Sequence, residues 1–492
     1  MIDKTVLLLI LDGFGINKEK EGNAIAIAKT PNLEKLYKSS IHTTLNASGI
    51  YVGLPKNIMG NSEVGHTTIG AGRRVKQYYS LINDDIETNE FYQKREIKQS
   101  VLGTKGNIHI MGLLSDGGIH SHIDHLLAII KYIGNTTKNI NIYIHIFSDG
   151  RDAEYKSVKK YIEYLNKHVS YNMNISTVIG RFYAMDRDKR WDRTKETYDL
   201  LTLHKGTEFN SINIAIDDAY NKDLTDEFLP PSFISNTPII SKNDLVIFFN
   251  FREDRARQLS KMFEDNSFNI LCMVKYDTFI KKYIYKRLKV EKTLSEIISL
   301  NNLKQLKIAE TEKYAHVTYF FNGGVEIPYK GEDRILIPSL KVKTYDTVPF
   351  MRAEEITENI LSNIDKMYTL IVANFANADM VGHTGNFKAA IKSIETIDKM
   401  IGKILKNIKE KNIDLIITGD HGNAEEMIKN KEIYKEHTTF PVPFIFKNKN
   451  VKTEKILQKG ELSDLSPTIL SLLNISKPKQ MIGINLLKGC NV

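Results

Sequence analysis

Short apolar runs alternate along this chain with longer amphipathic segments, and this alternation restricts the fold more than any other feature of the sequence. Such a pattern is typical of parallel strands joined by crossover helices, that is, of an α/β fold. Apolar residues recur every three or four positions over Lys388–Ile408, which predicts a long helix there. The predicted strands are Val6–Leu11, Ile108–Leu114, Ile142–Phe147, Leu245–Asn250, Leu370–Phe375 and Leu415–Thr418.

A further helix is predicted to begin at the segment Thr30-Pro31-Asn32-Leu33-Glu34. Threonine is a common N-cap, proline is favoured in the first turn, and a glutamate shortly after it assists the cap. This signal is structural and carries no catalytic weight.

The size and composition of the chain indicate a large soluble protein of two or three domains. Its 492 residues exceed what one ordinary core accommodates. The formal charge of +9 comes from scattered lysines, and no stretch is dense enough for a nucleic-acid-binding arm. Two cysteines are too few for a disulfide framework, and no apolar run approaches the ~20 residues of a membrane helix. We therefore expect a cytoplasmic protein whose positive charge favours a small anionic ligand.

Five short stretches carry residues suited to binding metal ions. Several of them follow predicted strands directly, and in an open α/β sheet the loops at the carboxyl ends of strands converge on one crevice. Asp379 and His383 are four residues apart, which places both on one face of a helical turn. The candidate residues are Asp12, Ser62, Asp379, His383, Asp420, His421 and His437.

Three carboxylates and three imidazoles without a thiolate suit divalent ions such as Mn²⁺, Zn²⁺, Co²⁺ or Mg²⁺. Six such side chains and a serine hydroxyl are too many for one tetrahedral ion and reasonable for two. Each residue alone is weak evidence, because an aspartate after a strand is usually a turn or capping residue. Their coincidence in one chain predicts a two-metal site.

The middle of the chain supplies residues suited to binding an anion. Ser115–His122 carries two histidines beside a glycine turn, and three arginine-containing motifs follow it. Guanidinium groups bind phosphate and carboxylate bidentately. The candidate residues are His120, Arg151, Asp152, Arg181, Arg187, Arg252 and Arg255.

At these motifs the chain resembles the cofactor-independent phosphoglycerate mutases, members of the alkaline phosphatase superfamily. The resemblance rests on Leu11–Gly15, Met59–His66, Asp379–His383 and Asp420–Asn423, and it extends over essentially the whole chain. It implies an alkaline-phosphatase-like three-layer α/β domain with a second α/β domain inserted. It also implies two metal ions, Mn²⁺ foremost, a monomer, and interconversion of 3-phosphoglycerate and 2-phosphoglycerate without 2,3-bisphosphoglycerate.

The resemblance assigns roles to the candidate residues. One metal would be held by Asp379, His383 and His437, and the other by Asp12, Ser62, Asp420 and His421. The anion-binding residues of the middle region would line the substrate site, with Lys313 as an additional active-site residue. We predict that Ser62 attacks the phosphate and that Asp152 is the general base and acid for the glycerate hydroxyls.

The distribution of these motifs predicts the domain organisation. Metal-binding motifs lie near both ends of the chain, and the arginine motifs lie between them. We therefore expect a metal-binding domain formed by residues 1–75 and 290–492, and an inserted substrate-binding domain formed by residues 76–289.

Two other classes of function are open at this point. A phosphopentomutase, phosphatase or sulfatase of the same superfamily would share the metal residues, but a broad phosphatase has no use for the arginine set. A basic nucleic-acid- or anion-binding protein without catalysis would show a basic stripe with interleaved aromatic residues and would leave the metal-binding motifs unexplained.

Overall fold

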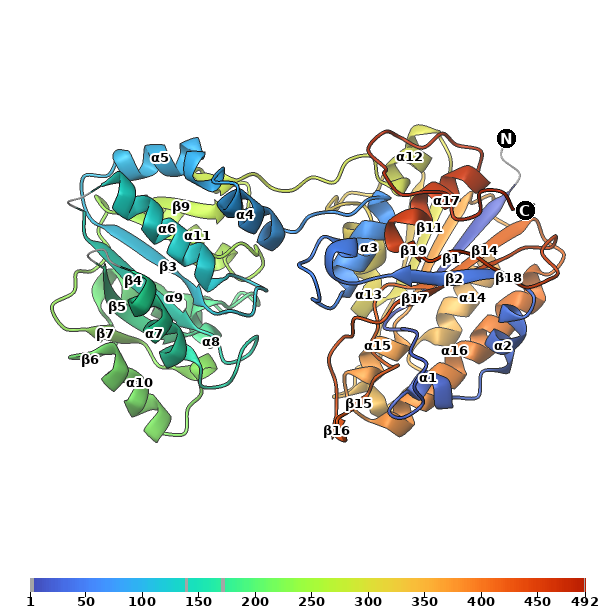
Figure 1. The fold of residues 1–492 in the computed structure, drawn as a ribbon, viewed down its shortest axis with the longest axis horizontal. Coiled ribbons are helices and arrows are strands. Elements are labelled where there is room, and N and C mark those ends of the chain that lie inside the picture. The colour runs from blue at the N-terminus through green and yellow to red at the C-terminus, as the bar shows by residue number, and fades with distance from the viewer. Residues whose placement is uncertain (1–3, 138–139, 170–172, 491) are drawn as a thin grey trace. The chain divides into compact units, whose positions relative to one another are not determined.

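The computed structural model describes residues 4–137, 140–169, 173–490 and 492, which form two compact units. The first unit comprises the residues up to Lys76 together with those from Leu288 onward. The second comprises Gln77–Arg287. Accordingly, the first unit in Figure 1 carries both the blue and the red end of the colour scale.

A nine-stranded mixed sheet forms the centre of the first unit. Its first five strands are parallel, β17 is antiparallel to both of its neighbours, and the short β18 and β19 pair with β2. In sheet order the strands are β12 (Glu332–Ile337), β11 (Gln305–Glu310), β13 (Leu370–Phe375), β1 (Thr5–Leu11), β14 (Ile413–Gly419), β17 (Val442–Lys447), β2 (Ile41–Asn46) and β18 (Lys455–Ile456), with β19 (Gly460–Glu461) beside β2. A separate hairpin pairs β15 (Ile428–Lys429) with β16 (Glu432–Ile433).

Helices cover both faces of this sheet, because alternate residues of its strands point into two different cores. In β1, Val6, Leu8 and Ile10 pack with α3 (Ser62–Ala71), α12 (Leu294–Leu300) and α17 (Leu465–Leu472). Leu7 and Leu9 pack on the other face with α2 (Pro31–Tyr37), α14 (Ala353–Asn363) and α16 (Phe387–Ile408). The first unit is therefore a three-layer α/β domain (Figure 1). Its remaining α-helices are α1 (Ala24–Ile27), α13 (Thr311–Ala315) and α15 (Asn377–Gly382).

The second unit has its own eight-stranded sheet and one continuous core. All neighbouring strands are parallel except β5 and β7. In sheet order the strands are β10 (Tyr283–Tyr285), β9 (Asn269–Val274), β8 (Leu245–Phe248), β3 (Ile108–Leu114), β4 (Ile142–Ser148), β5 (Met173–Gly180), β7 (Ser232–Ile234) and β6 (Thr207–Phe209). Its helices are α4 (Tyr78–Glu87), α5 (Arg95–Leu102), α6 (Ile123–Thr136), α7 (Val158–His168), α8 (Arg181–Ala184), α9 (Trp191–Leu203), α10 (Ile212–Asn221) and α11 (Arg257–Asp265).

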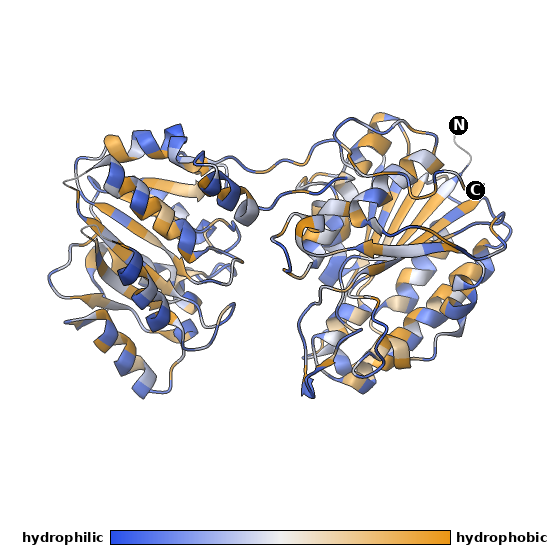
Figure 2. Cartoon of the chain, viewed as in Figure 1, coloured by the Kyte–Doolittle hydropathy of each residue, from blue (hydrophilic) through white to orange (hydrophobic). Residues whose placement is uncertain are grey.

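Hydropathy follows these layers within each unit. Figure 2 shows orange strands at the centre of the first unit and helices that are orange on one side and blue on the other. Among the described residues, no helix combines the length and the apolar character that crossing a membrane requires.

The helix predicted to begin near Thr30 is present as α2, with Thr30 at the N-cap position and Pro31 as its first residue, but the threonine side chain does not cap it. Thr30 makes no side-chain capping hydrogen bond. Instead, the carboxylate of Asp398 in α16 accepts hydrogen bonds from the backbone N–H groups of Asn32 (3.3 Å) and Leu33 (2.8 Å). A charged acceptor from a packed neighbouring helix satisfies the free N–H groups of the first turn, so the threonine is not needed for that purpose.

Candidate active site

Three neighbouring parallel strands of the first unit bring their following loops to one place. Asp12 follows β1, Asp379 lies in α15 just after β13, and Asp420 and His421 follow β14. Strand β1 pairs with β13 on one side and with β14 on the other, with Leu11 opposite Phe375 and Gly419. The carboxyl ends of the three strands are therefore level, and the aspartates meet although they are far apart in sequence.

Ser62 is the first residue of α3 and points into this cluster. The preceding Asn61 caps the helix, because its side chain accepts a hydrogen bond from the backbone N–H of Val64 at 3.1 Å. The Ser62 hydroxyl is buried, donates to Asp12 Oδ1 at 3.1 Å and lies 3.0 Å from His421 Nε2. Ser62 does not cap the helix, and its hydroxyl faces an aspartate and a histidine. It is therefore a candidate catalytic residue.

Lys313 in α13 joins the same cluster with a buried ammonium group. Its Nζ donates to Asp12 Oδ1 (2.6 Å), Asp379 Oδ2 (2.6 Å) and Ser62 Oγ (2.7 Å). Burial lowers the pKa of Lys313, but the nearby carboxylates outweigh this effect and raise the pKa above its ordinary value. Burial raises the pKa of Asp12 and of Asp379, but the charge of Lys313 and the neighbouring histidines hold both pKa values well below the ordinary one. The ammonium and both carboxylates are therefore charged at neutral pH.

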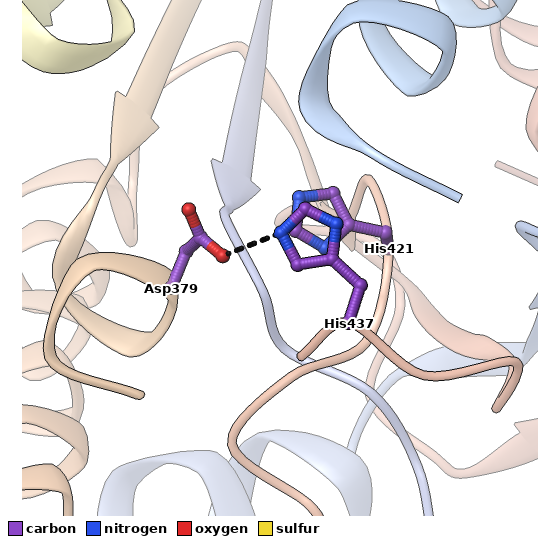
Figure 3. Close-up of side chains that lie close together, drawn as sticks. All are labelled: Asp379, His421 and His437. Atoms are coloured by element: carbon purple, nitrogen blue, oxygen red, sulfur yellow. Dashed lines mark ion pairs between the residues drawn. The ribbon is translucent and has the colours of Figure 1, made fainter. Parts of the chain in front are cut away.

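Three histidines surround the other side of Asp379. His383 Nε2 and His437 Nε2 each lie 3.2 Å from Asp379 Oδ1. The rings of His421 and His437 lie close together, with centroids 3.9 Å apart and an interplanar angle of 32°. Figure 3 shows the Asp379 carboxylate facing these two rings, with the ion pair to His437 dashed. The backbone carbonyls of Lys435 and Gly60 orient His383 and His437 through their Nδ1 atoms, at 2.6 and 3.0 Å.

Among the residues that the structure describes, two groups of three side chains have ligand atoms close enough to share a metal ion. The atoms of each group lie within 4.8 Å of one another; one group is Asp379, His421 and His437, and the other is Asp12, His66 and Asp420. This grouping differs from the predicted ligand sets. His421 lies with Asp379 and His437 in the place predicted for His383, and His66, which was not predicted, lies with Asp12 and Asp420. His421 Nε2 also lies 3.4 Å from Asp12 Oδ1 and 3.5 Å from Asp420 Oδ2, so it borders both groups.

The chemistry of this cluster fits divalent metal ions. Its donors are buried carboxylate oxygens and imidazole nitrogens, the ligands that such ions prefer. Asp420 Oδ2 is buried and has no hydrogen-bond partner among the described residues, although a buried carboxylate oxygen is costly to leave unpaired. A metal ion would satisfy it.

The predicted anion-binding residues also gather at strand ends, in the second unit. They follow the adjacent strands β8, β3, β4 and β5. His120 follows β3, and Arg151 and Asp152 follow β4. Arg181 opens α8 after β5, and Arg187 lies beyond it in the loop before α9. The remaining two, Arg252 and Arg255, lie in the loop between β8 and α11.

Two aspartates that the sequence analysis did not select bind several of these residues. Asp254 lies 3.1 Å from Arg187 Nη1, 3.2 Å from Arg252 Nε and 3.7 Å from His120 Nδ1. Asp149 accepts a hydrogen bond from Arg181 Nη1 at 2.6 Å. Asp149 lies two residues before Arg151 and Asp254 lies directly before Arg255, and this place beside arginines is the signal that identifies them.

The arginines crowd one another. Burial lowers the pKa of Arg255, and the charges of Arg187 and Arg181 lower it further. Burial and the charge of Arg252 lower the pKa of His120 to about 2, so this imidazole is neutral. Arg151 is more exposed and lies 3.4 Å from Glu227. Guanidinium groups close enough to repel one another form a site that favours an anion.

Comparison with known proteins identifies the family. The family model of the Metalloenzyme superfamily matches residues 4–477 of this chain. The 2,3-bisphosphoglycerate-independent phosphoglycerate mutases of Clostridium novyi and Clostridioides difficile are each 45% identical to this chain, and the alignments cover 99% of it and 100% of each relative. The chain belongs to the 2,3-bisphosphoglycerate-independent phosphoglycerate mutase family. Its resemblance to these enzymes, predicted from the motifs, is confirmed.

A solved phosphoglycerate mutase supports the same fold. The enzyme of Leishmania mexicana, determined at low cobalt concentration, is 28% identical, with a TM-score of 0.78 over 98% of this chain and 97% of that one. The predicted fold class, an alkaline-phosphatase-like α/β domain with a second α/β domain inserted, is confirmed. As a member of this mutase family, the chain is a metalloenzyme that uses divalent ions.

Proposed function

We propose that this chain interconverts 3-phosphoglycerate and 2-phosphoglycerate through a phosphoserine at Ser62, without 2,3-bisphosphoglycerate. The observation that carries the proposal is the buried contact of the Ser62 hydroxyl with Asp12, His421 and Lys313. Full-length relatives at 45% identity, named as such mutases, support the reaction class.

Ser62 is the nucleophile in this proposal. The bond between Ser62 Oγ and phosphorus forms as the bond between phosphorus and the substrate oxygen breaks. The Ser62 hydroxyl donates toward Asp12 Oδ1, so its proton leaves on that side. Lys313 also donates to Ser62 Oγ and stabilises the negative charge that the oxygen develops as it loses the proton.

Two divalent ions complete the site, and Mn²⁺ is the ion that we propose, although Mg²⁺, Co²⁺ and Zn²⁺ suit the same ligands. One would be held by Asp379, His383 and His437, and the other by Asp12, Ser62, Asp420 and His421. When bound, they supply positive charge that favours the ionised serine and neutralises the phosphoryl oxygens.

The arginines of the second unit bind the glycerate part in this proposal. Glycerate must stay bound while Ser62 carries the phosphoryl group, because its release would leave a phosphatase. Its carboxylate suits the guanidinium groups of Arg187, Arg252 and Arg255. Asp152 gives a proton to the glycerate oxygen that leaves when Ser62 is phosphorylated, and it then takes the proton from the glycerate hydroxyl that attacks the phosphoserine. Arg181 holds this carboxylate through a hydrogen bond of 2.5 Å to Asp152 Oδ2.

The remaining predictions of the sequence analysis belong with this function. We place the enzyme in glycolysis and gluconeogenesis, as a cytoplasmic monomer that acts on a small molecule without a nucleic-acid or membrane partner. A phosphatase is the second candidate, because it would share the metal residues. The buried arginine Arg181 and its two carboxylate partners favour the mutase, since releasing inorganic phosphate does not require them.

Ser62→Ala tests the covalent route. We expect it to abolish formation of 2-phosphoglycerate and of the phosphoserine, while the Mn²⁺ content stays close to that of the wild type. Thr67→Ala, in the same helix, is the matched control and should retain activity. Substantial mutase turnover by Ser62→Ala would contradict a phosphoserine intermediate.

A further inference from the structure

A buried asparagine connects the cluster to a histidine that no predicted role uses. Asn374 lies in β13, in the otherwise apolar run Leu370–Phe375, and its side chain is fully buried. Its Nδ2 donates to Asp12 Oδ2 at 2.8 Å and lies 3.1 Å from His66 Nε2. An amide nitrogen has two hydrogens and no lone pair to offer, so it serves both neighbours as a donor. His66 Nε2 must therefore be the acceptor.

The other ring nitrogen of His66 faces acceptors. His66 Nδ1 lies 2.9 Å from the backbone carbonyl oxygen of Ser62 and 3.3 Å from Asp420 Oδ2. The hydrogen of the imidazole is therefore on Nδ1 and is donated to Ser62, one helical turn earlier in α3. Both nitrogens of the buried His66 ring are thus hydrogen-bonded to protein groups.

We propose that His66 and Asn374 are positioning residues: together they link the backbone of Ser62 to the Asp12 carboxylate and so hold the nucleophile in place. The inference rests on the proposed role of Ser62. Asp12 binds the Ser62 hydroxyl through one oxygen and, through Asn374 and His66, the Ser62 carbonyl through the other. The serine is thereby held at both its side chain and its main chain.

Close packing of the helix supports this role. A Cβ atom on Gly65 would lie 2.7 Å from the backbone oxygen of Asp420, so α3 rests directly on the loop that follows β14. A shift of this turn after loss of the His66 link would therefore change the distances between Ser62 and the residues of that loop. The same geometry argues against His66 as a metal ligand, although it is grouped with Asp12 and Asp420, because its Nε2 lone pair points at Asn374.

The test compares His66→Leu with His66→Asn in the full-length enzyme loaded with Mn²⁺. The leucine removes both hydrogen bonds, whereas the asparagine amide N–H can replace the Nδ1 donor to Ser62. A displacement of the nucleophile by about 1 Å costs on the order of 100-fold in rate. We expect His66→Leu to lower kcat and the rate of Ser62 phosphorylation by about 10- to 100-fold, with the KM for 3-phosphoglycerate changed less than about 3-fold. We expect His66→Asn to recover most of this loss, and both variants to keep two Mn²⁺ per chain.

A double-mutant cycle with Asn374→Ala tests the link itself. Because the two residues belong to one chain of hydrogen bonds, the combined loss should be close to the larger single loss rather than to the product. If Asn374→Ala does not fold, Asn374→Ser, which keeps a hydroxyl donor, takes its place in the cycle. Any one of four results would overturn the positioning role. These are an unchanged kcat in His66→Leu, the loss of one Mn²⁺ from His66→Leu, no recovery of kcat in His66→Asn, and single-variant losses that multiply in the double variant. Failure of the proposed function appears differently, because wild-type enzyme would then form no phosphoserine, which would overturn both proposals.

Discussion

Arg181→Met should unfold the second unit more readily, because it removes the positive member of a buried three-charge cluster. The Arg181 side chain is 3% exposed and those of Asp149 and Asp152 are 0% and 16% exposed. Removing one member of a buried ion pair typically costs about 3–5 kcal/mol. Asp149 keeps two backbone donors, the N–H groups of Arg151 (3.1 Å) and Asp152 (2.9 Å), and Asp152 is partly solvated. We therefore expect the lower end of that range, about 3 kcal/mol.

Tryptophan fluorescence can follow the urea unfolding of the second unit. Trp191, the single tryptophan, lies at the start of α9 within the second unit, so its fluorescence during urea unfolding follows that unit. The double variant Arg181→Met/Asp149→Asn is the control, since removing a charge from each side should recover about half of the loss. A loss below about 1 kcal/mol for Arg181→Met, or no recovery in the double variant, would refute the argument from buried charge.

Three further perturbations test other parts of the account. Asp152→Asn should slow mutase turnover more than it slows phosphorylation of Ser62; equal losses in single-turnover experiments would remove Asp152 from its role as general base. Lys307 is buried without a hydrogen-bond partner for its Nζ among the described residues, and burial lowers its pKa to about 7. Because the unfolded chain keeps the ordinary lysine pKa of about 10.4, stability should rise between pH 7 and pH 10 and be lost as the pH falls toward 7. Lys307→Met should flatten this rise in urea-unfolding free energies, and an unchanged slope would argue against it. Gly70→Ala should lower both kcat and thermal stability, because its Cβ would lie 2.0 Å from the backbone oxygen of Phe321; a fully active, stable variant would show that this contact relaxes.

The sequence predicts the elements that are long, apolar and buried on both faces. The strands Ile108–Leu114 and Leu370–Phe375 are confirmed with the predicted ends, since polar or glycine-containing loops bound each run. Strand β17 is an exception, because it is apolar and buried but was not predicted. Strand β2 was not predicted either. Residues of β2 alternate between buried and half-buried positions, and its sequence Ile-His-Thr-Thr-Leu-Asn offers few apolar residues to count.

Some residues of the site can be predicted from local sequence, whereas others depend on tertiary packing. Asp12, Asp379 and Asp420 can be placed together from the sequence because parallel strand ends meet at one edge of a sheet. Asn374 was missed. A polar residue within a buried apolar strand needs a hydrogen-bond partner, so its position in the sequence could have indicated a role. His66 was quoted within a motif but given no role, because its partners Asn374 and the Ser62 carbonyl are set by tertiary packing. Likewise, Asp398 as the cap of α2 depends on how two helices pack.

The most direct test of the central claim is conversion of 3-phosphoglycerate to 2-phosphoglycerate by the EDTA-treated protein, before and after Mn²⁺ is restored and without 2,3-bisphosphoglycerate. We predict that activity disappears on chelation, returns with Mn²⁺, and is accompanied by phosphate bound covalently to Ser62. Release of inorganic phosphate alone would contradict it and favour a phosphatase, and activity that persists without metal would contradict the two-metal site.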